Sequence, residues 1–111
     1  MLKASNRSAE IRMADVPVLP GCQALIEAGI ESTLAPDNRL VSEKIVVQSD
    51  GTDLEIACLF DPQTSGGLLF GVAENKAQQV IDFLKGEGFG DTAVIGQVTD
   101  SDDGVSALRI K

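Results

Sequence analysis

A continuous apolar run, Leu68-Leu69-Phe70-Gly71-Val72, stands just before an amphipathic pattern over residues 74–85, and this succession limits the folds open to the chain. An uninterrupted apolar run predicts a strand that is buried on both faces, at the centre of a sheet. The apolar residues of the second segment recur at the spacing of one helix face, and they are Ala77, Val80, Ile81 and Leu84. The sequence therefore favours a layered fold in which a helix packs against a sheet.

The rest of the chain alternates between strand and helix patterns. Strands are predicted over residues 9–13, 45–47, 93–99 and 105–110, and helices over residues 1–6 and 22–28, the first being the last turn of a helix that starts upstream. Residues 36–38 predict a turn. The last two strands are expected to form a hairpin across residues 100–104. Residues 45–47 would form another hairpin with residues 54–60, where a short buried helix fits nearly as well.

This order of elements predicts an α+β fold, with a mostly antiparallel mixed sheet and helices packed on one of its faces. The length of 111 residues suits one domain, which we assign to residues 1–111. A chain of this size can bury a core without disulfide or metal crosslinks.

The composition excludes several classes of function. The chain contains no His, so a Ser-His-Asp triad, a Cys-His nucleophile or a typical zinc site cannot be built from it. Nine Lys and Arg face 17 Asp and Glu, and the net charge of −8 repels a phosphate backbone, so no nucleic acid partner is expected. No apolar run approaches the roughly 18 residues of a membrane span. The N-terminus also lacks a signal peptide pattern, so we expect a cytoplasmic protein without a membrane partner.

Two features that resemble metal or redox sites have simpler interpretations. Cys22 and Cys58 are far apart in the sequence and have no third ligand type nearby, which predicts buried, structural thiols. Residues 100–104 are rich in Asp, like a calcium loop. If Asp100 is position one, however, Gly104 falls at position five instead of six, and Lys111 replaces the Glu needed at position twelve. We interpret this segment as a solvated turn.

The segment Asp61-Pro62-Gln63-Thr64-Ser65-Gly66-Gly67, called here the Asp61–Gly67 loop, has the composition of a ligand site. Pro62 keeps Asp61 out of the helical region, and the two glycines let the backbone approach a ligand closely. Such a loop can present several N–H donors to an anion. It is neither a P-loop, because no Lys follows the glycines, nor a nucleophile elbow. The residues alone favour a tight turn that enters a strand, and they leave the anion site open.

The chain from Leu59 to Leu69 closely resembles the signature of the selenophosphate synthetase family, also called selenide, water dikinase. Other stretches follow the order of that family: Leu19-Pro20-Gly21 before a helix, Asn38-Arg39, and Val94-Ile95-Gly96-Gln97-Val98 near the end. The resemblance covers nearly the whole chain and departs from the family pattern over residues 40–55. It implies the C-terminal domain shared with AIR-synthase-like, ATP-dependent enzymes, and an α+β fold.

Several functional expectations follow from this resemblance. The family makes selenophosphate from selenide, ATP and water, releasing AMP and phosphate, with magnesium holding the nucleotide in a homodimer. Its reactive Cys or selenocysteine, its Lys and its magnesium ligands precede this domain. The resemblance therefore implies a fragment without its N-terminal ATP-binding domain. That fragment should be inactive alone, hold no catalytic or metal-binding residue and bind no cofactor tightly.

Within this chain, the resemblance assigns substrate binding to the Asp61–Gly67 loop. The site residues expected there are Asp61, Gln63, Thr64, Ser65, Gly66 and Gly67. Backbone N–H groups of the last three, with the Thr64 hydroxyl, would position a phosphate or the selenium-bearing substrate, and Asp61 would orient water or a cation. Two other hypotheses compete with this one. The chain could be a free-standing, non-catalytic docking module, or part of a sister enzyme that acts on another phosphorylated substrate.

Overall fold

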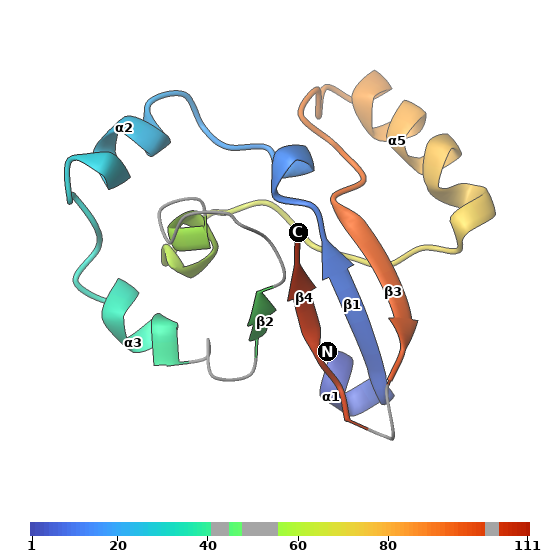
Figure 1. The fold of residues 1–111 in the computed structure, drawn as a ribbon. Coiled ribbons are helices and arrows are strands. Elements are labelled where there is room, and N and C mark those ends of the chain that lie inside the picture. The colour runs from blue at the N-terminus through green and yellow to red at the C-terminus, as the bar shows by residue number, and fades with distance from the viewer. Residues whose placement is uncertain (41–44, 48–55, 102–104) are drawn as a thin grey trace.

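The computed structural model, which describes residues 1–40, 45–47, 56–101 and 105–111, has the predicted α+β fold (Figure 1). Its sheet has four strands in the order β2-β4-β1-β3. In chain order, the strands are β1 (Arg7–Ile11), β2 (Ile45–Val47), β3 (Gly96–Asp100) and β4 (Leu108–Ile110). The strand expected over residues 45–47 is thus present with these bounds, and those expected over residues 9–13, 93–99 and 105–110 are present with shifted or shorter bounds.

The strand pairing differs from the expected mostly antiparallel arrangement. β1 pairs antiparallel with β3, whereas β4 pairs parallel with both β1 and β2. The predicted C-terminal hairpin is wrong, because β1 lies between β3 and β4. A turn signal predicts that the chain reverses locally, but it does not determine which strand becomes the neighbour. The loop of this expected hairpin lies partly outside the described residues, since residues 102–104 are not among them.

The contact between β1 and β4 forms the most buried part of the sheet. Ser8 of β1 and Ile110 of β4 are both fully buried. The Ser8 hydroxyl accepts a hydrogen bond from the Ala107 N–H at 3.1 Å, so this buried polar group is satisfied. The Lys111 N–H donates to the Ile11 carbonyl at 2.9 Å and extends the ladder. A small, hydrogen-bonded side chain on β1 thus allows β4 to pack closely beside it.

Four α-helices and three short 3₁₀ helices have bounds that lie within the described residues. The α-helices are α1 (Leu2–Ser5), α2 (Cys22–Glu27), α3 (Ala35–Arg39) and α5 (Ala77–Gly86), and the 3₁₀ helices are η1 (Met13–Asp15), η3 (Cys58–Phe60) and η4 (Glu74–Lys76). Together η4 and α5 confirm the helix predicted over residues 74–85. Asn6 follows α1 in the left-handed conformation, with φ of 50°. Gly29, beyond α2, has φ of 72° and provides the expected left-handed stop.

Two local expectations change in the structure. The turn predicted over residues 36–38 is part of helix α3, because a proline fits the first turn of a helix, where its missing N–H is not needed. Of the segment expected to pair with residues 45–47, residues 54–55 lie outside the described structure. Residues 58–60 form η3, and β2 pairs with β4 instead. The helical alternative for this segment is therefore confirmed over its described part.

Among the described helices, the main contact with the sheet is that of α1 with β1, whereas α5 mainly contacts η4. In Figure 1, α5 lies at the upper right, beyond the start of β3, whereas α2 and α3 surround η3 at a distance from the strands. Accordingly, α2 and α3 make their main contacts with η3. Among the described residues, no helix is both long and apolar enough to cross a membrane.

The apolar run over residues 68–72 is not the central strand that its composition predicts. It has no strand assignment, and the residues Leu68 and Leu69 are 92% and 64% exposed. Apolar composition indicates how much free energy would be gained by burying the segment. A strand also needs a neighbouring strand to complete its backbone hydrogen bonds. β1 and β4 occupy the centre of the sheet, and this segment pairs with neither edge strand among the described residues.

Candidate functional site

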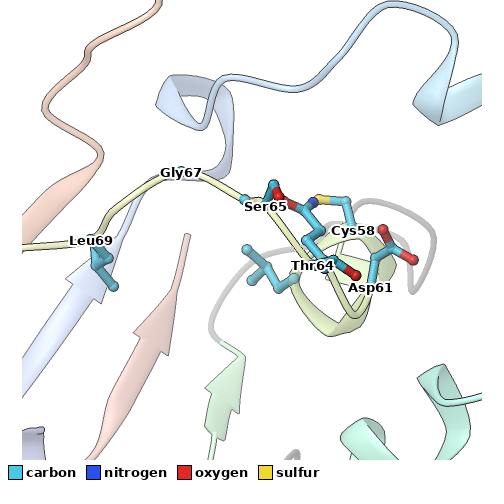
Figure 2. Close-up of a pocket in the computed structure, with 9 residues that line it drawn as sticks. Cys58, Asp61, Thr64, Ser65, Gly67 and Leu69 are labelled. Atoms are coloured by element: carbon cyan, nitrogen blue, oxygen red, sulfur yellow. The ribbon is translucent and has the colours of Figure 1, made fainter.

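The Asp61–Gly67 loop borders an open pocket of about 550 Å³ at the end of η3 (Figure 2). All six residues expected at a substrate site lie here: Asp61, Gln63, Thr64, Ser65, Gly66 and Gly67. Cys58, Leu59 and Leu69 complete the lining. Figure 2 shows Cys58, Asp61 and Thr64 grouped at the end of η3, with Gly67 and Leu69 farther along the extended chain.

The loop leaves η3 in the conformation that its proline requires. Asp61 has φ of −67° and ψ of 121°, which is extended backbone, because Pro62 disfavours a helical residue before it. At the last residue of η3, the Phe60 carbonyl accepts a hydrogen bond from the Asn38 side-chain amide at 2.9 Å. Helix α3 is thereby tied to the start of the loop. Sequence reasoning noted Asn38 as a family landmark but gave it no role at the site.

The backbone N–H groups of the loop are the groups best placed to bind a ligand. Within the described part of the chain, the N–H groups of Ser65, Gly66 and Gly67 have no hydrogen-bond partner. These donors adjoin a pocket in which an anion could satisfy them. Consecutive N–H groups without a partner in the protein can bind an anion, because each carries a partial positive charge and can donate a hydrogen bond to it.

The two glycines of the loop are not equivalent. A Cβ atom at Gly66 would lie 2.5 Å from Oε1 and 3.1 Å from Cβ of Gln63, so the Gln63 side chain folds over the glycine. A Cβ atom at Gly67 would meet nothing within 4 Å. Gly66 therefore makes room for a polar side chain within the loop, whereas Gly67 leaves its backbone open.

Cys58 is a pocket residue without the character of a nucleophile. Cys22 and Cys58 are not joined in a disulfide, and both are half-buried, whereas the sequence predicted that they would be buried. Burial, mainly, and repulsion from Cys22 and Asp61 raise the pKa of the Cys58 thiol. A thiol with a raised pKa stays protonated at neutral pH and reacts slowly, because the thiolate is the reactive form. This agrees with the structural role expected for this residue.

The pocket residues do not by themselves fit a magnesium ion. Mg²⁺ binds through carboxylates and phosphate oxygens in octahedral geometry, and Asp61 supplies the carboxylate among the described lining residues. No group of three His, Cys, Asp or Glu side chains in the described ranges is arranged to hold a metal. The donors of the loop suit an anion instead.

Comparison with known proteins assigns the chain to a family. The family model described as AIR synthase related protein, C-terminal domain, matches residues 1–109. The chain is 38% identical over 99 residues to a selenide, water dikinase of Pseudomonas straminea, and the match covers 88% of the chain and 28% of that relative. It is 32% identical over 109 residues to one of Paraburkholderia xenovorans, covering 97% and 31%. It is also 41% identical over 98 residues to one of Citrifermentans bemidjiense, covering 88% and 28%.

These relatives confirm the resemblance seen at the loop signature. The chain spans about three-tenths of the length of the curated relatives it matches. Because the family model extends over nearly all of its residues, the chain belongs to the AIR synthase related family, as a C-terminal domain similar to those of the selenide, water dikinases.

Proposed function

We propose that this chain is the C-terminal part of a selenide, water dikinase, which makes selenophosphate from selenide, ATP and water and releases AMP and phosphate. The names of its relatives and the complete loop signature support this proposal. The chain corresponds to about three-tenths of those relatives, and we place the sites for ATP and magnesium in the rest of the protein. The residues 1–111 alone are therefore inactive, and the complete enzyme is a cytoplasmic homodimer.

Within that enzyme, the Asp61–Gly67 loop positions an anionic group, which is a phosphate or the selenium-bearing substrate. The observation that carries this role is the set of three consecutive N–H donors, at Ser65, Gly66 and Gly67, without partners beside an open pocket. Hydrogen bonds to a charged acceptor are stronger than those between neutral groups. Such local donors are needed because the net charge of −8 otherwise repels an anion.

The side chains of the loop supply further hydrogen-bonding groups beside these backbone donors. The Thr64 hydroxyl and the Gln63 amide can each donate one further hydrogen bond to the same anion. Asp61 cannot donate when it is ionised, so it orients a water molecule or a cation that accompanies the anion. Phosphoryl transfer depends on such positioning, together with a metal and a nucleotide supplied elsewhere in the protein.

Substitutions in the complete enzyme test the role of the loop. Thr64→Ala removes one donor, and we expect the KM for the anionic substrate to rise about fivefold. Gly66→Val should have a larger effect, because its side chain would collide with Gln63. Thr33→Ala is a matched control, since Thr33 is exposed on the protein surface away from the pocket. If Thr64→Ala and Gly66→Val leave both turnover and KM unchanged, the loop is a simple turn.

The source reading frame tests the wider proposal. An in-frame segment of the type Thr-Asp-x-Thr-Gly-Phe-Gly upstream of the Met1 codon, preceded by a glycine-rich segment with Cys and Lys, would support it. A stop codon and a ribosome-binding site directly before Met1 would overturn it. Selenophosphate formation by residues 1–111 alone would contradict the expected inactivity.

A second candidate function is a non-catalytic docking module derived from the same domain. The exposed apolar segment over residues 68–72 favours this alternative, because such a segment on a protein surface often marks an interaction site. The two candidates differ in their response to Thr64→Ala. A docking module should bind its partner with unchanged affinity, whereas the enzyme should lose substrate affinity.

A further inference from the structure

The Asn38 side chain makes a long-range contact at the start of the proposed binding loop. Its Nδ2 donates to the Phe60 carbonyl at 2.9 Å, and the two residues are 22 positions apart in the chain. Phe60 is the last residue of η3, and Asp61 follows directly. Among the described residues, no backbone N–H folds back to cap the C-terminal end of η3. The amide of Asn38 therefore serves as the cap of this short helix.

Helix α3 presents Asn38 from a restrained position. Ala35, at the first turn of the helix, is only 2% exposed. Arg39, at its last turn, forms an ion pair with Glu31 of the preceding segment. Helix α3 also packs directly against η3. A side chain held by a buried first turn and an anchored last turn can fix the position of a partner that has little structure of its own.

The loop needs such external support, because its own residues do not fix its conformation. Gly66 and Gly67 have no Cβ atom and allow a wide range of backbone angles. In the described part of the chain, the N–H groups of Ser65 to Gly67 form no internal hydrogen bonds. Ordering each residue of a free loop costs about 1–2 kcal/mol of conformational entropy. A fixed starting point lowers the number of conformations that must be lost when a ligand binds.

We propose that Asn38 is a positioning residue, which holds the Asp61–Gly67 loop in its anion-binding conformation through the Phe60 carbonyl. This inference rests on the proposed role of the loop as an anion site. Asn38 itself does not line the pocket, so it acts on the ligand only through the loop.

The test compares variants of the complete enzyme during titration with inorganic phosphate, with the backbone amide signals of Ser65, Gly66 and Gly67 followed by NMR. Asn38→Ala removes the donor without adding charge. Asn38→Asp keeps the shape but replaces the donor with a carboxylate. Asn75→Asp is the control, because Asn75 is exposed in η4, outside the pocket lining, and adds the same charge.

Both Asn38 variants should shift the loop amide signals before phosphate is added and weaken phosphate binding about fivefold, the effect of one lost hydrogen bond. Two controls separate this effect from general destabilisation. Thermal unfolding is measured in parallel, and the NMR signals outside the loop should stay in place. The Asn75→Asp control should leave the loop signals and the affinity unchanged. Unchanged loop signals and affinity in Asn38→Ala would overturn the inference.

Thr64→Ala distinguishes failure of this inference from failure of the proposed function. If Thr64→Ala weakens phosphate binding and Asn38→Ala does not, the loop binds anions and the positioning role is wrong. If the unsubstituted enzyme shows no phosphate-dependent shift of the Ser65, Gly66 and Gly67 signals, the anion site itself is wrong. In that case the inference fails with the proposed function.

Discussion

Replacing Gly96 by Ala should destabilise the sheet, because the backbone of β1 lies too close to this residue to leave room for a Cβ atom. Gly96 pairs with Ile11 at the end of the antiparallel ladder. A Cβ atom built at Gly96 would lie 3.0 Å from the Glu10 carbonyl carbon and 3.1 Å from the Ile11 Cα, and closer still to the Glu10 carbonyl oxygen. These are backbone atoms, which cannot rotate away as a side chain could. The strands would therefore have to separate.

The expected cost follows from two contributions. Forcing an extra methyl group into a packed site costs about 1–3 kcal/mol. Separation of the strands also strains the neighbouring bond from the Arg12 N–H to the Ile95 carbonyl, now 2.9 Å long, whose loss would cost about 1 kcal/mol more. The sum is about 2–4 kcal/mol, less the few tenths of a kcal/mol that alanine gains by restricting the unfolded chain. For a domain of this size, this corresponds to a melting temperature lower by about 10 °C.

Urea unfolding followed by circular dichroism measures this effect, with Gly90→Ala as the matched control. A Cβ atom at Gly90 meets nothing within 4 Å, so this variant should be as stable as the original or slightly more stable. Gly96→Ala should lower the urea midpoint while leaving the slope unchanged, because the same surface is exposed on unfolding. Equal midpoints for the two variants would refute the close approach of β1 and β3 at Gly96.

Three further predictions concern single side chains. The buried Thr99 hydroxyl has no hydrogen-bond partner among the described residues, so Thr99→Val should stabilise the chain by about 1 kcal/mol, and an unchanged or lower melting temperature would contradict this. Burial, mainly, raises the pKa of Cys58; in a Cys22→Ser background its reaction with a disulfide reagent should therefore need a higher pH when folded than in urea, and identical pH profiles would disprove the shift. The stability linked to this shift is present below the ordinary thiol pKa and is lost as pH rises through the raised value. A hydrogen bond from Lys111 to Glu10, 2.9 Å long, lowers the pKa of that carboxyl, and its linked stability is lost as pH falls through the lowered value. Lys111→Met should raise the Glu10 pKa in an NMR titration, and an unmoved titration curve would exclude the contact.

The elements predicted correctly are those whose signals lie within a few neighbouring residues. The apolar spacing over residues 74–85 produced η4 and α5, and Gly29 ended α2 in the left-handed conformation. Pro62 placed Asp61 in extended backbone. Each of these features depends on residues that are close together in the chain, so it could be predicted from the sequence alone.

The same is true of the residues of the candidate site. The Asp61–Gly67 loop is a contiguous segment, so its residues lie together around the pocket in any fold that keeps the loop intact. Its composition and its resemblance to a family signature were both readable from the sequence. The family match over residues 1–109 and the relatives bear out that resemblance.

What the tertiary structure decided is the choice of partners between distant segments. It placed β1 between β3 and β4, left residues 68–72 exposed, and brought the Asn38 amide to the Phe60 carbonyl. None of these follows from local patterns, because apolar residues favour burial against any apolar surface, and a hydrogen-bond donor can donate to any suitable carbonyl. The sequence by itself determined the family, the local elements and the loop. Only the folded chain, in which these competing contacts are satisfied together, decided which strands pair and which side chain supports the loop.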